Sequence, residues 1–517
     1  MIRIGIDVGG TNTDAVIMQE NKVLQAVKAS TSEDVMTGVI AALEHVLQAA
    51  NVNRDAVDVV MIGTTHFTNA VVQRRDLAAT AAIRLGLPAT AALPPMVDWP
   101  EDLRAKLGGH VYLAHGGHEF DGRLISPLDE AELMQIAEDI GAKGVSSVAI
   151  SAVFSPVNTD MEHQAETIIR RVLPDIDVTL SSDIGRIGIL ERENAAIMNA
   201  CLRALSRKTV QAFARALKNA GVKAPFFLTQ NDGTLMNADY AETFPVLTFA
   251  SGPTNSMRGA AFLSNLQDAI VVDVGGTTTD VGALHHGFPR EASVAVDVGD
   301  VRTNFRMPDV FSIGLGGGSL VVAAEDKVNV GPQSVGYRLS QEGYVFGGNT
   351  LTSTDIAVAA GKADIGEANR VASLDSSLVE GALATIENLL TVSVERVRLS
   401  AEPIPVIAVG GGSILVPDKI AGLDVIKPPH FAVANAVGAA IAQISGEVDR
   451  VFALADMSRD EAVAQAKQEA IDKAVEAGAL RDSVNVVDVE DVPLAYLPGN
   501  ATRIRVKAVG DLHIGEA

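Results

Sequence analysis

Cysteine is almost absent from this chain of 517 residues, in which Cys201 is the single example. One thiol cannot form an internal disulfide, and it cannot hold an iron–sulfur cluster that needs several cysteines of the chain. Such scarcity is typical of proteins in a reducing compartment. Cys201 itself is interpreted as a small, buried, hydrophobic residue of a helix. We therefore expect a fold that its core holds together without covalent cross-links.

Long hydrophobic runs and positive charge are also scarce. The longest apolar stretch, residues 145–154, is interrupted by serines, and it is about half as long as the roughly 20 residues that span a bilayer. The chain has 41 Lys and Arg against 64 Asp and Glu, a net charge of −23, which argues against nucleic acid and anionic membranes as partners. No signal peptide precedes the first apolar run. These features predict a soluble, cytoplasmic protein.

Aromatic residues make up only 4% of the chain, whereas hydrophobic residues as a whole make up 47%. A core of Ala, Val and Ile is typical of α/β proteins with buried strands. A chain of this length exceeds one core, so roughly two to four domains are expected. The pattern predicts an N-terminal lobe at 1–185 with a Gly/Pro-rich, irregular excursion or small inserted subdomain at about 85–122, connecting helices at 186–268, a second lobe at 269–455 and a small α+β extension at 456–517. Within the second lobe, residues 302–348 are expected to be rich in loops.

The strongest signal is an octet that occurs twice. Residues 7–14 are DVGGTNTD and residues 273–280 are DVGGTTTD, and apolar runs flank both copies. This pattern predicts a strand, a tight turn and a second strand. Paired glycines let the backbone approach phosphate oxygens closely. The alternative is an ordinary β-turn in which Asp and Thr satisfy local N–H groups, but two near-identical copies favour a phosphate site.

The octets supply most of the candidate site residues. Asp7 and Asp273 end their strands and are candidate ligands of Mg²⁺ through water, because Mg²⁺ keeps several waters and needs few carboxylates. Asp14 and Asp280 are candidates for orienting a water or a substrate group. The candidate phosphate-binding residues are Gly9, Gly10, Thr11 and Thr13 in the first octet and Gly275, Gly276, Thr277 and Thr278 in the second.

Two glycine-rich loops follow apolar strands in the second half. Gly410, Gly411 and Gly412 lie in the sequence VGGGS and are candidates for contact with adenosine, since an adenine ring can lie flat against glycine backbone. The alternative is a flexible strand-to-helix loop. Residues 314–319, GLGGGS, are the weaker candidate for the same role. Neither loop has the pattern of a Rossmann or a Walker A motif.

The two octets, the late GGGS loop and the helices between the lobes resemble the actin, sugar-kinase and Hsp70 ATPase superfamily. The resemblance implies an α/β fold with two actin-like ATPase lobes, built from duplicated ribonuclease H-like domains. Other segments resemble one branch, the hydantoinase A/5-oxoprolinase family, of which the chain is similar to a short form. These segments are IGIDVGGT at 4–11, GTT at 63–65, TNA at 68–70, GGHEFDGR at 116–123, EREN at 191–194, NA at 199–200, SGP at 251–253, PLAY at 493–496 and IRV at 504–506.

The resemblance implies ATP-dependent hydrolysis of a cyclic amide or imide of the hydantoin or 5-oxoproline type, through phosphorylation of the carbonyl oxygen, with ATP and Mg²⁺. It allows for a second enzyme subunit and for a homo-oligomer. Thr64, Thr65, His66 and Asn69 are the candidate substrate contacts. The chain departs from the family pattern at His66-Phe67 and at residues 254–257, two probable substrate-side loops, so the substrate is the least transferable feature.

Other functions fit the same fold, because a fold does not determine the acceptor. The main alternative is an ATP-dependent small-molecule kinase or carboxylase subunit, and a non-enzymatic ATP-driven switch is less favoured. His110, His115 and His118, together with Asp121, also suggest a metal site. Their spacing matches no known zinc pattern, so surface histidines are the favoured interpretation.

Overall fold

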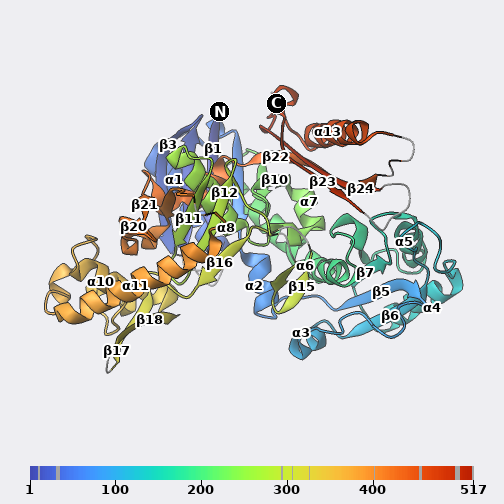
Figure 1. The fold of residues 1–517 in the computed structure, drawn as a ribbon, viewed down its shortest axis with the longest axis horizontal. Coiled ribbons are helices and arrows are strands. Elements are labelled where there is room, and N and C mark those ends of the chain that lie inside the picture. Colours follow the sequence, from blue (N-terminus) through green and yellow to red (C-terminus); the bar gives the residue numbers. More distant parts are fainter. Residues whose placement is uncertain are drawn as a thin grey trace.

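The structure is a computed structural model, and it describes residues 1–9, 12–30, 35–292, 295–304, 307–324, 327–400, 402–452, 454, 457–494 and 501–514. Candidate residues Gly10 and Thr11 lie outside the described residues, as do the last two residues of the PLAY segment. The described chain is a mixed α/β protein with two large sheets and a smaller one (Figure 1). This confirms the predicted α/β fold with two lobes.

The largest sheet has nine strands in the order β23-β24-β22-β10-β9-β4-β1-β2-β3. Their bounds are β1 Ile2–Val8, β2 Asn12–Gln19, β3 Lys22–Ser30, β4 Val59–Thr64, β9 Phe226–Thr229, β10 Thr234–Asn237, β22 Gln443–Phe452, β23 Asn485–Pro493 and β24 Thr502–Gly510. The last strands of the chain therefore continue the sheet that its first strands begin. The sequence analysis predicted a separate appended unit there. It missed the pairing with the first sheet because pairing between distant strands leaves no local signal in the sequence.

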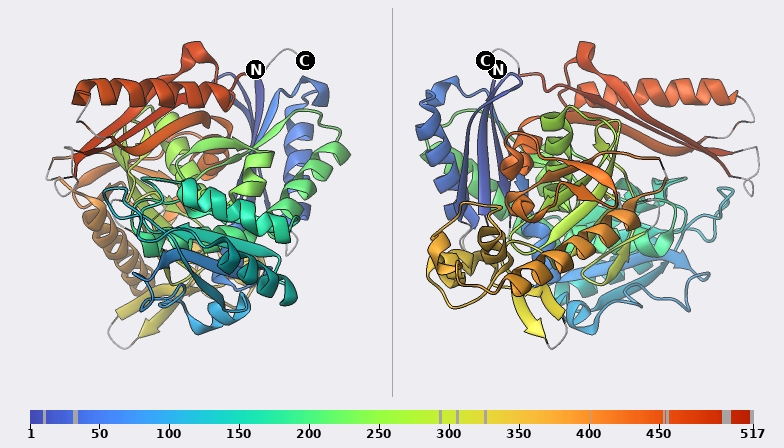
Figure 2. Two further views of the ribbon diagram at one scale, coloured as in Figure 1. Left: turned by 90° about the vertical axis from the view of Figure 1, so that its right-hand side faces the viewer. Right: turned by 60° about the vertical axis from the view of Figure 1, so that its left-hand side comes forward.

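Helices cover this first sheet. They include α1 (Val35–Ala50), α2 (His66–Val72), α6 (Ile189–Asn219), α7 (Ala238–Thr243) and α13 (Arg459–Glu476). In α13, alanines every four residues are buried against strands β22 and β24, as expected where a helix must approach a sheet closely. Both views of Figure 2 show this helix, in red, lying along the C-terminal strands. Within the region 186–268, where connecting helices were expected, residues Ile189–Asn219 form the single continuous helix α6.

The second large sheet has the order β13-β12-β11-β19-β21-β20, with β16 paired to β12. Its strands are β11 Ala269–Val274, β12 Thr279–His285, β13 Phe288–Pro289, β16 Val310–Ile313, β19 Val406–Val409, β20 Lys419–Ile420 and β21 Leu423–Ile426. Helix α11 (Ser376–Val397) packs Ile386 and Leu390 into the core of this sheet. By length and composition alone, α11 is the one described helix that could cross a membrane.

The region expected to be rich in loops contains several short strands. In 302–348 these are the end of β15 Val301–Thr303, the strand β16 given above, β17 Ser319–Ala324 and β18 Lys327–Ser334, followed by helix α9 Leu339–Glu342. Strand β14 Val296–Val298 precedes this region, and helix α10 Ser353–Ala359 follows it. The strands have only three to eight residues, and glycines are frequent between them. The sequence pattern therefore did not indicate these strands. The hairpin of β17 and β18 projects with α10 and α11 at the lower left of Figure 1.

A four-stranded parallel sheet, β6-β5-β7-β8, lies at the lower right of Figure 1. Its elements are β5 Thr80–Leu87, α3 Glu101–Lys106, β6 His110–His115, α4 Glu130–Ala142, β7 Ser147–Ala152, α5 Asp160–Val172 and β8 Asp177–Leu180. The end of β5, α3 and β6 lie in 85–122, so this range is not irregular; it belongs to a small sheet of its own, which agrees with the predicted small subdomain. Buried Arg84 binds Glu193 of α6 through two hydrogen bonds, which anchors this sheet to the first lobe.

Helices α8 (Ser251–Ser264) and α12 (Ala434–Ala440) cross between the two large sheets. A Cβ atom on Gly259 would overlap the backbone of Ala434, and one on Gly438 would overlap the backbone of Asn255. Only glycine permits this approach. Helix α8 packs on β11, and α12 packs on β1. The crossing brings the carboxyl ends of both strands together, and these ends carry the two octets.

Candidate functional site

The first octet forms the predicted hairpin. Asp7 on β1 lies opposite Asp14 on β2, and the backbone N–H of Gly9 donates to the carbonyl of Asn12 at 3.0 Å. Asp7, Thr13 and Asp14 are buried, and Gly9 is partly exposed. The turn lies at the end of the strands where ligands bind in open α/β sheets.

The second octet repeats this geometry. Asp273 on β11 lies opposite Asp280 on β12, and the N–H of Gly275 donates to the carbonyl of Thr278 at 2.9 Å. Gly276 is partly exposed, whereas Thr277 and Thr278 are exposed at the tip of the turn. The exposed backbone and hydroxyl groups of this turn can donate hydrogen bonds to a bound anion.

Two amides and a lysine hold the carboxylates of the first hairpin. Asn255 of α8 donates to Oδ1 of Asp7 at 3.0 Å. Asn435 of α12 donates to Oδ2 of Asp7 at 3.0 Å and to Asp14 at 2.9 Å. Lys28, opposite Asp14 on β3, forms an ion pair with Asp14 at 2.6 Å. Burial raises the pKa of Asp7 to about 6, although the hydrogen bond from Asn255 lowers it.

The second hairpin has fewer partners. Burial raises the pKa of Asp273 to about 7, a hydrogen bond with Ser256 of α8 lowers it, and the charges of Asp280 and Asp7 raise it further. The hydroxyl of Ser312 donates to Asp280, whose pKa burial also raises. Asn255 and Ser256 are consecutive on α8 and contact Asp7 and Asp273 respectively, so the two hairpins lie on either side of this helix end and face each other across a gap.

Asn255, Ser256 and Asn435 were not among the predicted site residues. Asn255 and Ser256 are consecutive on α8, and one contacts Asp7 while the other contacts Asp273. The sequence analysis assigned residues 254–257 to a substrate-side loop; the structure places them in a buried helix. Polar side chains inside a helix of small residues were the available signal, since buried amides need partners. Nothing in the sequence shows which partners these are.

The GGGS loop at 410–413 lies against the second hairpin. A Cβ atom on Gly410 would overlap the carboxylate of Asp273, and one on Gly412 would crowd the backbone at Val274 and Gly275. A Cβ atom on Gly411 would meet open space. The loop is thus held against the hairpin on both sides of one exposed glycine. The structure brings these predicted adenosine contacts beside the predicted phosphate contacts.

The loop at 314–319 supports the second hairpin from another side. The N–H groups of Gly317 and Gly318 donate to the carbonyls of Gly275 and Gly276 at 3.0 and 2.7 Å. The hydroxyls of Ser353 and Thr354, at the start of α10, in turn bind this loop. Its glycines are therefore occupied in packing against the turn, which leaves the GGGS loop at 410–413 as the stronger candidate for adenosine.

The four predicted substrate contacts follow β4, next to the first hairpin. Thr65 donates to the carbonyl of Val8 at 3.3 Å, and Ser251 of the SGP segment donates to the carbonyl of Thr64 at 3.2 Å. Asn69 is exposed one helical turn further along. Burial lowers the pKa of the half-buried His66, so its ring is neutral near pH 7. These residues lie together at the edge of the gap.

The predicted histidine cluster does not converge on a metal site within the described residues. His115 instead pairs with Glu132 at 3.1 Å, and His118 is buried. Among all the described residues, one group has metal-binding geometry: Asp268, His285 and His286. It is exposed and lies outside the histidine cluster. The exposed His115 agrees with the favoured interpretation of surface histidines, whereas His118 is buried and its Nδ1 has no hydrogen-bond partner among the described residues.

Comparison with known proteins agrees with the geometry. Residues 3–173 match the hydantoinase/oxoprolinase N-terminal region, and residues 192–404 match the hydantoinase/oxoprolinase family. The chain is 27% identical over 471 residues to the caprolactamase subunit alpha of Pseudomonas jessenii, covering 85% of this chain and 65% of that protein. It is 25% identical to the acetophenone carboxylase gamma subunit of Aromatoleum aromaticum, covering 69% and 53%.

The solved structure of the ATP-dependent caprolactamase from Pseudomonas jessenii superposes with a TM-score of 0.79, at 19% identity, over 99% of this chain and 88% of that one. At this identity the likeness shows the fold alone. The chain spans between about a half and two thirds of the length of the curated relatives named above. It belongs to the hydantoinase/oxoprolinase family.

Proposed function

We propose that this chain is the ATP-using component of an enzyme that opens a cyclic amide or imide, of the hydantoin, 5-oxoproline or lactam type. One observation carries the proposal: the two octet hairpins face each other, with Asp7 and Asp273 joined through consecutive residues of α8. Family membership and the lactam-opening relative support the acceptor class.

The hairpins are suited to hold a polyphosphate between them. The backbone N–H groups and exposed hydroxyls of Thr277 and Thr278 would bind phosphate oxygens from one side. Gly9 would do so from the other, whereas the predicted contact Thr13 is buried and presents no exposed hydroxyl. Gly410, Gly411 and Gly412 would lie beside the adenosine. Phosphoryl transfer depends mainly on such positioning and on charge neutralisation.

The residues at the gap fit a hydrated Mg²⁺. The charge of Asp7 raises the pKa of Asp273, so a cation near both carboxylates would relieve this repulsion. Both carboxylate oxygens of Asp7 already accept amide hydrogen bonds, which favours contact through water. The buried Oδ1 of Asn255 accepts no hydrogen bond from the described residues and could accept one from such a water. Bound Mg²⁺ would supply neutralisation of the phosphate charge.

The acceptor would lie toward Thr64, Thr65, His66 and Asn69. In the proposed reaction, the carbonyl oxygen of the ring bonds to the γ-phosphorus while the bond between that phosphorus and ADP breaks. Water then adds to the activated carbon, the C–N bond breaks, and the nitrogen leaves with a proton. A further water releases phosphate and the carboxylate. A neutral His66 is suited to hydrogen-bond the ring without adding charge.

An ATP-dependent carboxylase subunit is the second candidate, because one relative is the acetophenone carboxylase gamma subunit. The same hairpins would then activate a carbonyl acceptor or bicarbonate. Both named relatives are subunits by description, so we also propose a second polypeptide as a partner, alongside homo-oligomers of this chain.

The test measures ADP release from the purified chain, alone and with a co-expressed partner, against a panel of lactams, hydantoins and 5-oxoproline. Ring opening through O-phosphorylation requires ADP in proportion to opened ring. A lactam with a heavy oxygen isotope at its carbonyl should deliver that oxygen to inorganic phosphate. ADP release that needs bicarbonate and yields a carboxylated product would replace this proposal with the carboxylase, and a stable phosphorylated product would replace it with a kinase.

A further inference from the structure

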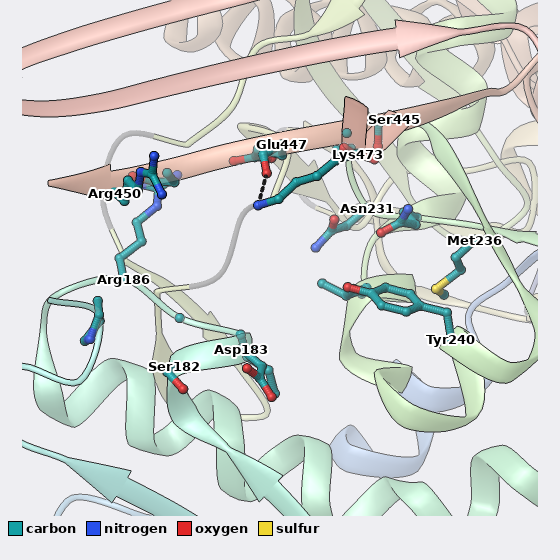
Figure 3. Close-up of a pocket in the computed structure, with 18 of the residues that line it drawn as sticks. Ser182, Asp183, Arg186, Asn231, Met236, Tyr240, Ser445, Glu447, Arg450 and Lys473 are labelled. Atoms are coloured by element: carbon teal, nitrogen blue, oxygen red, sulfur yellow. Dashed lines mark hydrogen bonds between the residues drawn. The ribbon is translucent and has the colours of Figure 1, made fainter. Parts of the chain in front are cut away.

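A second site lies on the far side of β9. A cavity of about 590 Å³ opens between the loop after β8, the segment of β9, β10 and α7, and the C-terminal strands with α13 (Figure 3). Its volume is within the usual range of small-molecule sites, roughly 300–1,000 Å³. None of the predicted site residues lines it. The cavity therefore needs an explanation of its own.

One end of the cavity is cationic. Arg186 extends from the loop after β8 toward Arg450 on β22 (Figure 3), and Arg503 on β24 lies close enough for its charge to act on Arg186. Arg450 and Arg503 have carboxylate partners, Glu469 at 2.8 Å and Asp449 at 2.7 Å.

Arg186 is poorly paired by comparison. Its nearest described carboxylate, that of Glu291, is 4.0 Å away and also binds Arg505 at 2.7 Å. Its Nε is buried and has no hydrogen-bond partner among the described residues. The rest of the side chain is partly exposed, and a buried N–H group without a hydrogen-bond partner is costly unless a ligand supplies an acceptor.

The other end of the cavity is acidic. Asp183 lies three residues before Arg186, and within the described parts of the chain its carboxylate has neither a hydrogen bond nor an ion pair. Tyr240 faces it from α7, with the hydroxyl toward the middle of the cavity (Figure 3). The hydroxyl of Ser182 is buried there without a described partner. This end offers acceptors suited to an ammonium group.

The cavity is neutral as a whole, because four cationic and four anionic side chains line it. Leu235, Met236 and Leu247 add apolar surface to the lining, and Met236 lies beyond Tyr240 as seen from the arginines (Figure 3). Separated opposite charges in a cavity with some apolar lining match a dipolar ligand with a short hydrocarbon chain. A singly charged ligand would leave one end unpaired.

We propose that this cavity binds a small zwitterionic amino acid, with its carboxylate at Arg186 and Arg450 and its ammonium group at Asp183 and Tyr240. Ring opening of a lactam yields such a molecule. The interpretation of the ligand as a reaction product rests on the proposed function, whereas the binding itself does not.

The cavity is also connected to the hairpins. Asn231 lines the cavity, and its carbonyl accepts a hydrogen bond from Thr254 at 2.8 Å. The next residue on α8, Asn255, holds Asp7. Two neighbouring residues of α8 therefore contact the cavity lining and the aspartate site. A ligand that moves Asn231 would act on Asp7 through Thr254 and Asn255.

Calorimetric titration of the full chain without nucleotide tests the proposal. The ligands are 4-aminobutyrate, 6-aminohexanoate and glutamate, compared with butylamine, pentanoate and the corresponding lactams. At least one amino acid should bind with a millimolar or tighter Kd, and the singly charged and neutral compounds should bind at least about 10-fold more weakly. No saturable binding of any amino acid, or equal binding of pentanoate or butylamine, would overturn the proposal.

Variants localise the binding. Asp183→Asn and Arg186→Gln should each weaken it by about 10-fold or more, and Tyr240→Phe, which removes one hydroxyl, should weaken it by a few fold. Matched controls on the second lobe, Asp424→Asn and Arg370→Gln, should leave it unchanged. Unchanged affinity in Asp183→Asn and Tyr240→Phe would overturn the assignment even if Arg186→Gln failed to fold. Amino-acid binding without lactam-dependent ADP release would support this site and refute the proposed function. Lactam-dependent ADP release without amino-acid binding would support the proposed function and refute this site.

Discussion

The two hairpins have the same register, since Asp7 faces Asp14 as Asp273 faces Asp280, yet their third strands differ. Lys28 pairs with Asp14 on one side, whereas Ser312 binds Asp280 on the other. Two amides hold Asp7, and one hydroxyl is the side-chain partner that lowers the pKa of Asp273. The two copies of the octet thus have the same backbone geometry. The residues around each copy differ, and so do the charges and hydrogen bonds that act on its aspartates.

This difference suggests a division of labour between the hairpins. In the first hairpin, amide hydrogen bonds hold both carboxylates, and Lys28 forms an ion pair with Asp14. These contacts keep Asp7 in position. The second is less well compensated, and the pKa of Asp273 is the higher of the two, about 7 against about 6. We infer that Asp273 depends more strongly on a bound cation to remain charged.

The largest expected effect comes from removing each carboxylate charge. Asp7→Asn and Asp273→Asn should each lower ATP turnover by about 100-fold or more. Asp7→Asn should have the larger effect, because its new amide would leave one of the two donors, Asn255 or Asn435, without an acceptor. Steady-state ADP release measures both. Retention of turnover and nucleotide affinity in both variants, at the level of the control Asp424→Asn, would refute the central hypothesis.

The next effect tests the two consecutive residues of α8. Asn255→Ala removes the support of Asp7 and of Thr229, so activity should fall by about 10- to 100-fold, as is typical when a supporting partner of a metal-site carboxylate is lost. Ser256→Ala removes one partner of Asp273 and should cost less. A larger loss in Ser256→Ala than in Asn255→Ala would reverse the comparison between the hairpins.

Glycine substitutions separate packing from ligand contact in the second hairpin. Gly410 has φ +87° and no room for a Cβ beside Asp273, so Gly410→Ala should destabilise the protein by about 1–3 kcal/mol. Gly411→Ala should keep its stability and weaken ATP binding by a few fold if the adenine lies on this loop. Thermal unfolding and nucleotide titration of both variants give the two readouts. Unchanged ATP affinity in Gly411→Ala would move the adenosine site elsewhere.

The smallest effect concerns the pH dependence of stability without nucleotide. The folded pKa values of Asp7 and Asp273, about 6 and 7, exceed the ordinary value of 3.8. The folded state therefore binds their protons more tightly than the unfolded state does. Their contribution destabilises the fold above pH 7 and is relieved as the pH falls through 7 and 6 toward 4. The charge of Asp14 raises the pKa of Asp7, the charges of Asp280 and Asp7 raise that of Asp273, and the charge of Lys28 lowers both.

Asp273→Asn should accordingly raise the unfolding temperature at pH 8 by roughly a degree or two, and the gain should shrink at pH 5, where the native residue is protonated. Asp7→Asn should give a smaller gain because it disturbs the amide clamp. Differential scanning calorimetry at several pH values makes the measurement, with Asp424→Asn as the exposed control. An equal gain at pH 5 and pH 8 would contradict the assigned pKa shift.

Local pattern was sufficient to predict the elements that carry the octets. Apolar runs on both sides of Gly-Gly-Thr predicted two strands and a tight turn, and both hairpins have that form. The same local reasoning missed β5 to β6 and the β17–β18 hairpin, because short strands between glycines and prolines show no clear period. It also separated β23 and β24 from the first sheet, since pairing with β22 joins distant parts of the chain.

The sequence by itself determined that two near-identical hairpins exist, that each presents carboxylates beside glycine backbone, and that the chain belongs with ATP-using relatives. These features depend on neighbouring residues, for which sequence order is sufficient. Only the tertiary structure decided that Asn255, Ser256 and Asn435 support the aspartates and that Lys28 distinguishes one hairpin from the other. It also created the cavity at Asp183 and Arg186. These contacts join residues far apart in the chain, and close packing at the glycines of α8 and α12 determines where they meet.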